Sequence, residues 1–261
     1  MKQSLEAFLS DFKRQAPLPD CFVVAYSGGV DSTVLLHVLH EMGMALHAVH
    51  VNHQIQLQAD AWELHCETQC QQWGIPFTAL KVNVQPSDLG LEGQARVLRY
   101  RAIFNWMKAN QRTVLLCAHH RDDQLETVLL QLLRGSGLRG VGGMRVVGPV
   151  GVDRHLYPDL LLCRPLLDSS KASLLEYARA NRLQYIEDPS NGDTTLRRNW
   201  VRHELLPSLI AHFPQSPKAL LQLAEFFRAH YSEEDSNTQV KAPQVISETG
   251  GLQLIQWRAL D

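Results

Sequence analysis

The sequence contains no apolar run long enough to cross a bilayer. Its longest apolar runs, such as residues 114–118, are far shorter than the roughly 18–20 residues that a spanning helix needs. The chain starts Met-Lys-Gln-Ser-Leu-Glu, which lacks the apolar core of a secretory signal. We therefore expect a soluble, cytoplasmic protein with no membrane partner.

Cysteine is scarce and shows no pairing motif. The chain has five cysteines, at positions 21, 66, 70, 117 and 163, and none of them forms a Cys-x-x-Cys pair. An odd number in a chain of 261 residues argues against a disulfide framework, and the spacing argues against a structural zinc site. We expect most of these thiols to be small buried side chains in a reducing compartment.

Charge of one sign is not in excess either, because 25 Lys and Arg residues stand against 27 Asp and Glu, a formal net charge of −2. A chain with this balance does not attract nucleic acid over its whole surface. Any nucleic-acid partner therefore requires a local patch of Arg and Lys, and we expect no DNA partner. Apolar residues make up 45% of the chain, which is enough to bury a sizeable core and excludes a disordered or fibrous protein.

What the sequence does contain is an alternation of short apolar runs and longer helical patterns. The β-rich runs are residues 21–26, 45–51, 77–82 and 113–118. Apolar residues recur at three- and four-residue spacing, the period of a helix with one buried face, at residues 32–42, 58–73, 92–109 and 122–133. This βαβ succession predicts an α/β fold, doubly wound around a mostly parallel sheet with helices on both faces.

The second half of the chain is predicted to be mainly helical. A glycine-rich stretch occupies residues 134–151, and one more strand is expected within residues 159–164. The patterns beyond it predict helices at residues 170–181, 199–210 and 216–230. The fold prediction is therefore an α/β domain followed by a helical segment.

The last part of the chain changes in composition. Residues 231–243 are polar and acidic and are interpreted as a linker, and residues 245–257 as the start of another small unit. We therefore divide the chain into a ligand-binding domain at residues 1–215 and a second part at residues 216–261. The second part is predicted to be a helical linker that begins a shortened C-terminal region.

The strongest chemical signal is Ser-Gly-Gly-Val-Asp-Ser at residues 27–32, between an apolar strand and a helix. Gly28 and Gly29 let the backbone approach a ligand closely, and N–H groups at a helix start form a cradle for phosphate. The residue types alone fit a plain turn equally well, with Asp31 or Ser32 as helix cap. Their order between a strand and a helix favours a phosphate loop, although the Gly-Lys-Ser/Thr of a Walker A loop is absent.

Residues 25–29 also approximate the Gly-x-Ser-x-Gly turn of a hydrolase, with Ala in place of the first Gly. Such a turn requires an acid and then a histidine downstream. Asp168 and His203 are the only plausible pair in the sequence. A hydrolase with Ser27 as nucleophile is therefore the alternative to a phosphate loop.

A second glycine motif, at residues 135–140, matches Gly-x-Gly-x-x-Gly letter for letter. In a dinucleotide-binding fold this motif follows a strand and opens a helix, whereas here it follows a predicted helix. We interpret it as a loop at a helix end, with Gly135 as the C-terminal cap.

A second polar cluster lies at residues 119–127, at the end of one predicted strand and the start of the next helix. The carboxyl ends of parallel strands meet at one edge of a sheet, so this cluster should face the phosphate loop. Asp123 and Glu126 share one helical face, and His119 lies just before them. Such a group could hold Mg²⁺ or an ammonium group, whereas a capped helix with solvated acids is the alternative. Zinc fits less well, because His119 and His120 are adjacent and no cysteine lies at ligand spacing.

With these clusters described, the chain resembles the tRNA(Ile)-lysidine synthetases of the PP-loop ATP-pyrophosphatase superfamily over roughly residues 20–210. The phosphate loop alone is shared with many proteins, but the combination is specific. The matching blocks are His50-Val51-Asn52-His53, Glu92 with Ala95-Arg96 and Arg99-Tyr100, His119 to Thr127, Leu132 to Leu138, Arg164-Pro165-Leu166, Glu187 to Asn191, and Arg198-Asn199. Gln54-Ile55-Gln56 departs from the family, which carries a basic residue there.

This resemblance implies an adenine-nucleotide alpha-hydrolase type of fold and an ATP-dependent ligase. The family joins L-lysine to C2 of the wobble cytidine of a tRNA(Ile) with a CAU anticodon. ATP first adenylates the base and releases pyrophosphate, and the lysine amine then displaces AMP. The implied cofactors are ATP and Mg²⁺, the implied partners are this tRNA and lysine, and the C-terminal part would contact the tRNA.

The resemblance also implies roles for individual residues. ATP binding falls to Ser27, Gly28, Gly29, Val30, Asp31 and Ser32. The catalytic set is Asp31, His119, Asp123 and Glu126, in which Asp31 and Asp123 would hold Mg²⁺, and Asp123 and Glu126 the lysine. Contacts to RNA or phosphate fall to Arg96, Arg198 and Arg202.

A tRNA sulfur transferase of the same superfamily is the alternative function. Such a protein carries sulfur on paired cysteines. Cys66 and Cys70 are separated by three residues on a predicted helix. Burial of both thiols is the competing interpretation.

Overall fold

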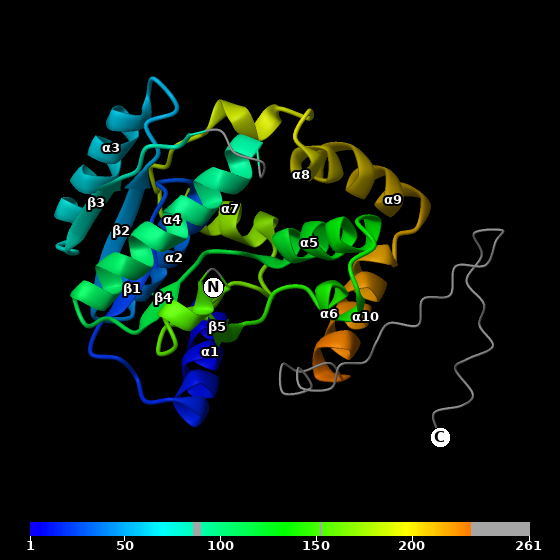
Figure 1. Cartoon of the computed structure of the whole chain (residues 1–261), viewed down its shortest axis with the longest axis horizontal. Coiled ribbons are helices and arrows are strands. Elements are labelled where there is room, and N and C mark those ends of the chain that lie inside the picture. The colour runs from blue at the N-terminus through cyan, green and yellow to red at the C-terminus, as the bar shows by residue number, and fades with distance from the viewer. Residues whose placement is uncertain (86–89, 152, 231–261) are drawn as a thin grey trace.

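A six-stranded sheet with the order β3-β2-β1-β4-β6-β5 forms the centre of the molecule (Figure 1). The structure is a computed structural model that describes residues 1–85, 90–151 and 153–230. The strands are β1 (Phe22–Ala25), β2 (Leu46–Asn52), β3 (Phe77–Lys81), β4 (Val114–Leu116), β5 (Val147–Pro149) and β6 (Leu161–Cys163). All neighbours pair in parallel except β5, which is antiparallel to β6. The predicted mostly parallel sheet is therefore confirmed, whereas β5, inside the glycine-rich stretch, was not predicted.

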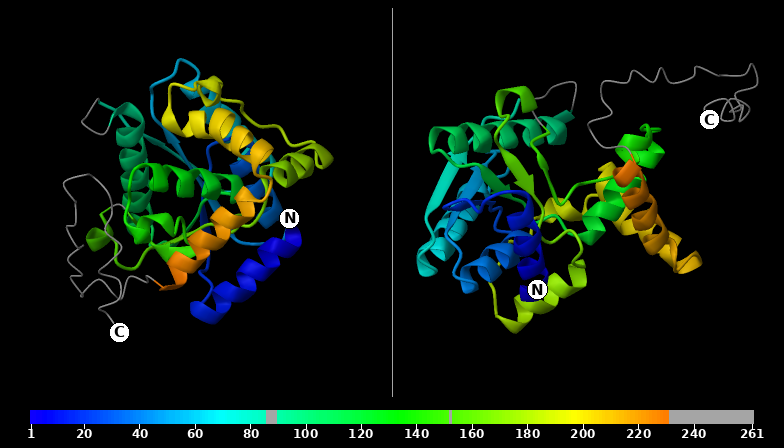
Figure 2. Two further views of the ribbon diagram at one scale, coloured as in Figure 1. Left: turned by 90° about the vertical axis from the view of Figure 1, so that its right-hand side faces the viewer. Right: turned by 90° about the horizontal axis from the view of Figure 1, so that it is seen from below.

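Helices cover both faces of the sheet, as expected for a doubly wound fold (Figures 1 and 2). The longer ones are α1 (Lys2–Gln15), α2 (Val30–Glu41), α3 (Ala59–Gln72), α4 (Gly90–Ala109), α5 (Arg121–Leu133), α7 (Lys171–Ala180) and α10 (Ser216–His230). Side chains alternate along β1, because Phe22 and Val24 join one core and Val23 the other. The first core includes α1, α2 and α7, and the second includes α4.

Helix α1 was not predicted, although its apolar side chains recur at helical spacing. Leu5, Phe8, Leu9 and Phe12 are all buried against the sheet side that α2 also covers. No helix among the described residues is long and apolar enough to cross a membrane.

The glycine motif at residues 135–140 caps α5, as the sequence indicated. Gly135 has a φ of +65°, and its N–H donates to the carbonyl of Leu132 at 3.0 Å. The Ser136 N–H donates to the carbonyl of Gln131, also at 3.0 Å, which completes a Schellman motif. The chain then forms the short helix α6 (Leu138–Val141) and no nucleotide loop.

The helix predicted at residues 199–210 is interrupted. The chain forms α8 (Arg197–Trp200), a π-helical turn η3 (Val201–Leu205) and α9 (Leu206–His212). Single π-helical turns are frequent at functional sites, and this one carries Arg202. Two 3₁₀ turns, η1 (Arg154–Leu156) and η2 (Pro189–Gly192), complete the described elements.

Helix α10 packs on α5, α6 and α9. Its Leu220 and Leu221 contact the core formed by Leu125, Leu129 and Val201. The boundary between residues 215 and 216 therefore coincides with no break in packing, and the division of the chain there stays a prediction. The linker predicted at residues 231–243 and the unit predicted at residues 245–257 lie outside the described residues.

Candidate active site

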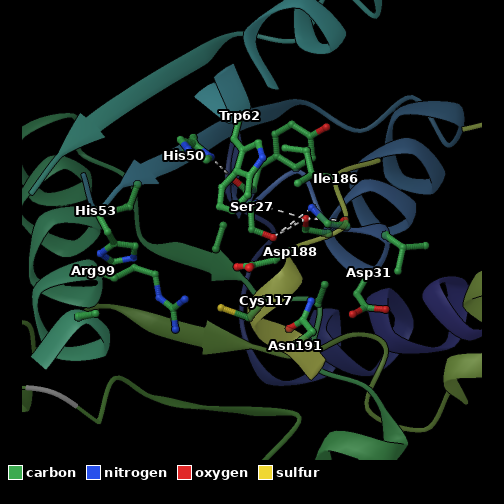
Figure 3. Close-up of a pocket in the computed structure, with 18 of the residues that line it drawn as sticks. Ser27, Asp31, His50, His53, Trp62, Arg99, Cys117, Ile186, Asp188 and Asn191 are labelled. Atoms are coloured by element: carbon green, nitrogen blue, oxygen red, sulfur yellow. Dashed lines mark hydrogen bonds between the residues drawn. The ribbon is translucent and has the colours of Figure 1, made fainter. Parts of the chain in front are cut away.

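A cavity of about 1020 Å³ opens at the carboxyl ends of the parallel strands, the edge at which α/β sheets bind ligands. Its walls come from the residues that follow β1, β2 and β4, from α4, and from the segment that follows α7. Figure 3 shows that Arg99 and His53 lie at one end of this cavity and Asp31 at the other. The two polar clusters predicted from the sequence therefore meet in one space.

The phosphate loop at residues 27–32 follows β1 and starts α2, with Gly29 as the N-cap. Gly28 has a φ of +81°, a left-handed conformation that favours glycine. A Cβ atom there would lie 2.5 Å from Ile186 Cδ1 and 2.8 Å from Cys66 Sγ. Both the backbone conformation and the lack of space require glycine at this position.

Hydrogen bonds fix the loop from inside and outside. Ser32 Oγ accepts from the Ser27 N–H at 3.2 Å and donates to the Gly29 carbonyl at 3.0 Å. The Ile186 N–H donates to the Gly28 carbonyl at 2.8 Å, and Ile186 pairs with Gly29 as an isolated parallel bridge. The free N–H groups of the first turn of α2 are thereby held in a fixed position, as an anion cradle requires.

Asp31 meets two cationic groups. Lys171 Nζ lies 2.6 Å from Asp31 Oδ1, and His120 Nε2 lies 3.7 Å from Oδ2. Burial alone would raise the pKa of Asp31, but the nearby His120 ring and the charge of Lys171 hold it below its usual value. Asp31 is therefore an ionised carboxylate on the cavity wall.

His120, which is not among the predicted site residues, lies between Asp31 of the phosphate loop and Asp123 of the second cluster. The ring is 3% exposed, and its Nε2 lies 3.4 Å from Asp123 Oδ2 while Nδ1 lies 3.6 Å from Asp122 Oδ2. Burial lowers the pKa of His120, but the nearby carboxylates of Asp122, Asp31 and Asp123 outweigh it and raise the pKa to about 9. The Asp123 N–H donates to His120 Nδ1 at 3.4 Å and the His120 N–H donates to Asp123 Oδ2 at 3.0 Å, and this reciprocal pair caps the start of α5.

Asp123 and Glu126 form an ion-pair cluster with Arg198 and Arg202, which we call the acid–arginine network. Glu126 is 1% exposed, and its two oxygens accept from Arg202 Nε at 2.6 Å and from Arg198 Nε at 2.7 Å. Asp123 Oδ1 accepts from Nη2 of the two arginines at 3.0 and 3.3 Å. Asp123 lines the cavity, whereas the buried Glu126 and the two arginines do not line it. The predicted acidic pair is thus brought together, but with arginine as its partner.

The other end of the cavity is basic. Arg96 and Arg99 line it from α4, with their guanidinium groups 5.1 and 5.5 Å from the ring centroid of Tyr100. His119 also lines the cavity, and its buried Nδ1 has no hydrogen-bond partner among the described residues. Burial and the charges of Arg164 and Arg96 hold the pKa of His119 well below its usual value. His119 is therefore neutral at pH 7. Arg99 also lines the cavity, although it is not among the site residues predicted from the sequence.

The loop after β2 bends over the cavity toward the turn that follows α7. Gln56 Nε2 donates to Asp188 Oδ1 at 3.2 Å, at the position where the sequence departs from the family it resembles. Asp188 also accepts from the Ser190 N–H at 2.9 Å, and Asn199 Nδ2 donates to the Ser190 carbonyl at 2.9 Å. The turn, with the cavity-lining Asp188 and Asn191 (Figure 3), is thereby connected to α8.

The geometry disagrees with a hydrolase triad. Asp168 lines a second cavity between α1 and α10, and neither it nor His203 lines the cavity that contains Ser27. His203 Nε2 instead lies 2.9 Å from the Asn191 carbonyl. Asp168 and His203, the pair that the sequence offered for a hydrolase, therefore do not act on Ser27.

The thiols of α3 do not resemble a sulfur carrier. Cys66 and Cys70 are fully buried, and burial raises the pKa of both, that of Cys70 to about 12. Sulfur transfer requires an accessible thiol that ionises near neutral pH. Burial, the competing interpretation of these two cysteines, is confirmed.

A glycine-containing phosphate loop at the carboxyl edge of a doubly wound sheet defines a nucleotide-binding α/β protein of the PP-loop class. The family model for the PP-loop domain matches residues 1–209, so the chain belongs to the PP-loop domain family.

Curated relatives give a finer similarity. The chain is 41% identical over 226 residues to a tRNA(Ile)-lysidine synthase of Pseudomonas fluorescens, a match that covers 85% of this chain and 49% of that protein. It is 44% identical over 210 residues to the tRNA(Ile)-lysidine synthase of Pseudomonas aeruginosa, covering 78% of this chain and 45% of the relative. The chain spans about half the length of the curated relatives it matches.

Among solved structures, the U34-tRNA thiolase NcsA from Methanococcus maripaludis superposes with a TM-score of 0.71 at 16% sequence identity. The match covers 97% of this chain and 84% of the thiolase. At this identity the likeness shows the fold alone, which is the fold predicted from the sequence.

Proposed function

We propose that this chain uses ATP to ligate L-lysine to C2 of the wobble cytidine of a tRNA(Ile) with a CAU anticodon. The observation that carries the proposal is one cavity lined by the phosphate loop, Asp123 and His119, in a chain 41% identical to a tRNA(Ile)-lysidine synthase over 226 residues. The protein would act in the cytoplasm, where tRNA, ATP and lysine meet.

The first step is adenylation of the base. Cytosine O2 attacks the α-phosphorus of ATP, an O–P bond forms, and the bond from that phosphorus to the bridging oxygen breaks, so that pyrophosphate leaves with the electron pair. Such a displacement requires fixed donors around the phosphates. The start of α2 offers them, and we assign ATP binding to Ser27, Gly28, Gly29, Val30, Asp31 and Ser32.

Mg²⁺ fits the donor chemistry of this edge of the cavity. No group of three or more His, Cys, Asp or Glu side chains within residues 1–85, 90–151 and 153–230 is arranged to hold a metal unaided. Asp31 and Asp123 both line the cavity and both turn an oxygen toward His120 Nε2, at 3.7 and 3.4 Å. Mg²⁺ commonly takes one or two carboxylates together with substrate phosphates and water. Bound by these two residues, it would neutralise phosphate charge.

The second step joins lysine to the activated base. The side-chain amine of lysine, whose free pKa is about 10.4, must lose a proton before it attacks C2. A C–N bond then forms, the bond from C2 to oxygen breaks, and AMP leaves. The neutral His119, whose Nδ1 has no partner among the described residues, is our candidate proton acceptor.

Asp123 and Glu126 are our candidates for holding the ammonium group of the incoming lysine. Asp123 lines the cavity and would be met first. Glu126 does not line the cavity and has both oxygens bonded to Arg198 and Arg202, so a lysine that reaches Glu126 must displace an arginine contact. Displacement of one cation by another keeps the buried carboxylate paired.

The basic end of the cavity is our candidate contact for RNA. Arg96 is exposed on α4, and Arg99 lines the cavity beside it. Single-stranded loops are read with their bases splayed out, and guanidinium groups hold the neighbouring phosphates. Arg198 and Arg202 reach phosphate only if they leave the acid–arginine network.

The test is a reaction with ATP, Mg²⁺, labelled lysine and an unmodified tRNA(Ile) transcript. The matched control is the same transcript with the wobble cytidine replaced by uridine. Lysine incorporation and release of AMP and pyrophosphate with the CAU transcript alone are expected. Pyrophosphate release without lysine incorporation, or equal reaction of both transcripts, would contradict the proposed substrate.

A further inference from the structure

The phosphate loop contains no cation of its own. Residues 27–32 supply backbone N–H groups, two hydroxyl groups and the carboxylate of Asp31, and the Lys of a Walker A loop is absent. The polyphosphate of ATP is strongly anionic, and the leaving pyrophosphate gains further charge as its bond to the α-phosphorus breaks. In addition to Mg²⁺, this chemistry favours a cation from elsewhere in the chain.

Lys171 brings a cation to the loop. It is the first residue of α7, it lines the cavity, and its Nζ lies 2.6 Å from Asp31 Oδ1. The Lys171 N–H donates to Asp122 Oδ2 at 2.8 Å, which ties the start of α7 to the start of α5. The side chain is 37% exposed, so a ligand in the cavity can reach it.

Four other cations near the cavity or the loop do not fit this position. His120 also contacts Asp31, but it is 3% exposed and does not line the cavity. The two arginines of the acid–arginine network already bond to carboxylates. Arg99 lines the cavity at the end opposite Asp31 (Figure 3). Lys171 alone among these side chains combines cavity exposure with contact to the loop.

The bonding of Lys171 leaves donors for a ligand. An ammonium group has three N–H donors and no acceptor. One donor is bonded to Asp31, and no other hydrogen bond of Nζ is formed within the described residues. Lys171 can therefore keep its contact with Asp31 while it donates to a phosphate oxygen. A purely structural role, in which Lys171 only neutralises Asp31 and anchors α7, is the competing explanation.

We infer that Lys171 binds the phosphates of ATP beyond the α-phosphate and neutralises the charge of the departing pyrophosphate. The inference rests on the proposed use of ATP by this cavity. Lys171 would then contribute to the binding of ATP but not of AMP, because AMP lacks the β- and γ-phosphates. A structural role of Lys171 would affect AMP and ATP alike.

The experiment measures the binding of ATP and of AMP by calorimetry, without tRNA or lysine. The unchanged chain is compared with Lys171→Met, with Lys171→Arg, which keeps the charge, and with the control Lys108→Met, an exposed lysine at the end of α4. A charged hydrogen bond contributes about 1.5–3 kcal/mol, so Lys171→Met should weaken ATP binding about ten- to hundredfold. AMP binding should change less than about twofold, and Lys171→Arg should retain most of the ATP affinity.

A second measurement needs no variant. ATP should protect Lys171 of the unchanged chain from acylation by an amine reagent, as read by mass spectrometry, and AMP should not. Equal weakening of AMP and ATP by Lys171→Met, or equal protection by the two nucleotides, would overturn the inference and leave the proposed function intact. If the unchanged chain binds no ATP, the proposed function itself fails.

Discussion

The phosphate loop and the acid–arginine network are built in opposite ways. The serine hydrogen bonds within the loop connect residues close in sequence, such as Ser27 and Ser32, which are five positions apart. The bonds of the network connect residues 72 to 79 positions apart, because α5 supplies the acids and α8 with η3 the arginines. A local motif can be recognised from a short stretch of sequence. The network cannot, because its residues come together only in the folded protein.

The comparison also concerns charge. The network balances the carboxylates of Asp123 and Glu126 with two guanidinium groups. The loop has a carboxylate and no cation, so its balance comes from His120 and Lys171 on other elements. We therefore expect changes in the loop to act on nucleotide chemistry, and changes in the network to act first on stability and on the use of lysine.

Asp31→Asn should give the largest loss of activity. An amide keeps the size of the side chain but does not offset the charge of Mg²⁺ or of Lys171 as a carboxylate does. We expect pyrophosphate release to fall by about 10²–10³-fold, the usual effect of removing one electrostatic contact from a reacting group. The melting temperature is the control. A folded Asp31→Asn protein with unchanged turnover would remove the loop from the mechanism.

Arg202→Ala should give the largest loss of stability. Breaking a buried ion pair costs about 3–5 kcal/mol, and because Arg198 remains on Glu126 we expect the lower end of that range. Arg197→Ala, an exposed neighbour, is the matched control and should change little. Chemical denaturation measures both variants. Equal stability of the two would show that the network does not hold α5 to the π-helical turn.

Gly28→Ala and Gly74→Ala together separate the effect of space from that of backbone conformation. Gly74 has a φ of +65°, similar to the +81° of Gly28, but a Cβ there meets nothing within 4 Å. Gly74→Ala therefore reports the left-handed strain alone, about 1–2 kcal/mol. Gly28→Ala adds a clash with Ile186 and Cys66, which should cost about 1–3 kcal/mol more. Equal unfolding free energies for the two variants would contradict the tight packing of the loop.

The elements that the sequence predicted are those with a strong local pattern. Helix α2 and strands β1, β2 and β4 follow from period and position in the chain. Helix α1 has the same helical spacing in Leu5, Phe8, Leu9 and Phe12 but is not among the predicted helices. Strand β5 has three half-buried residues that include Gly148 and Pro149, so no alternation marks it.

The site residues also differ in how far the sequence predicts them. The loop at residues 27–32 and the cluster at residues 119–127 are short continuous motifs and are predicted from sequence alone. His120 was passed over for His119, because adjacent histidines look alike until the fold shows which one faces Asp31 and Asp123. Lys171 and Ile186 reach the loop from distant segments and carry no motif of their own. Long-range contacts of this kind follow from the topology of the sheet and not from local sequence.

We propose that the loop serves adenylation of the tRNA and that Glu126, within the acid–arginine network, serves the lysine step. The substitution Glu126→Gln separates the two steps in single-turnover reactions with α-labelled ATP and CAU transcript, with and without lysine. A carboxylate holding an ammonium contributes about 1.5–3 kcal/mol, so lysine-dependent release of AMP should slow about ten- to hundredfold. Formation of the adenylated tRNA without lysine should stay near the rate of the unchanged chain. Equal loss in both steps by a folded Glu126→Gln protein would contradict the division of roles.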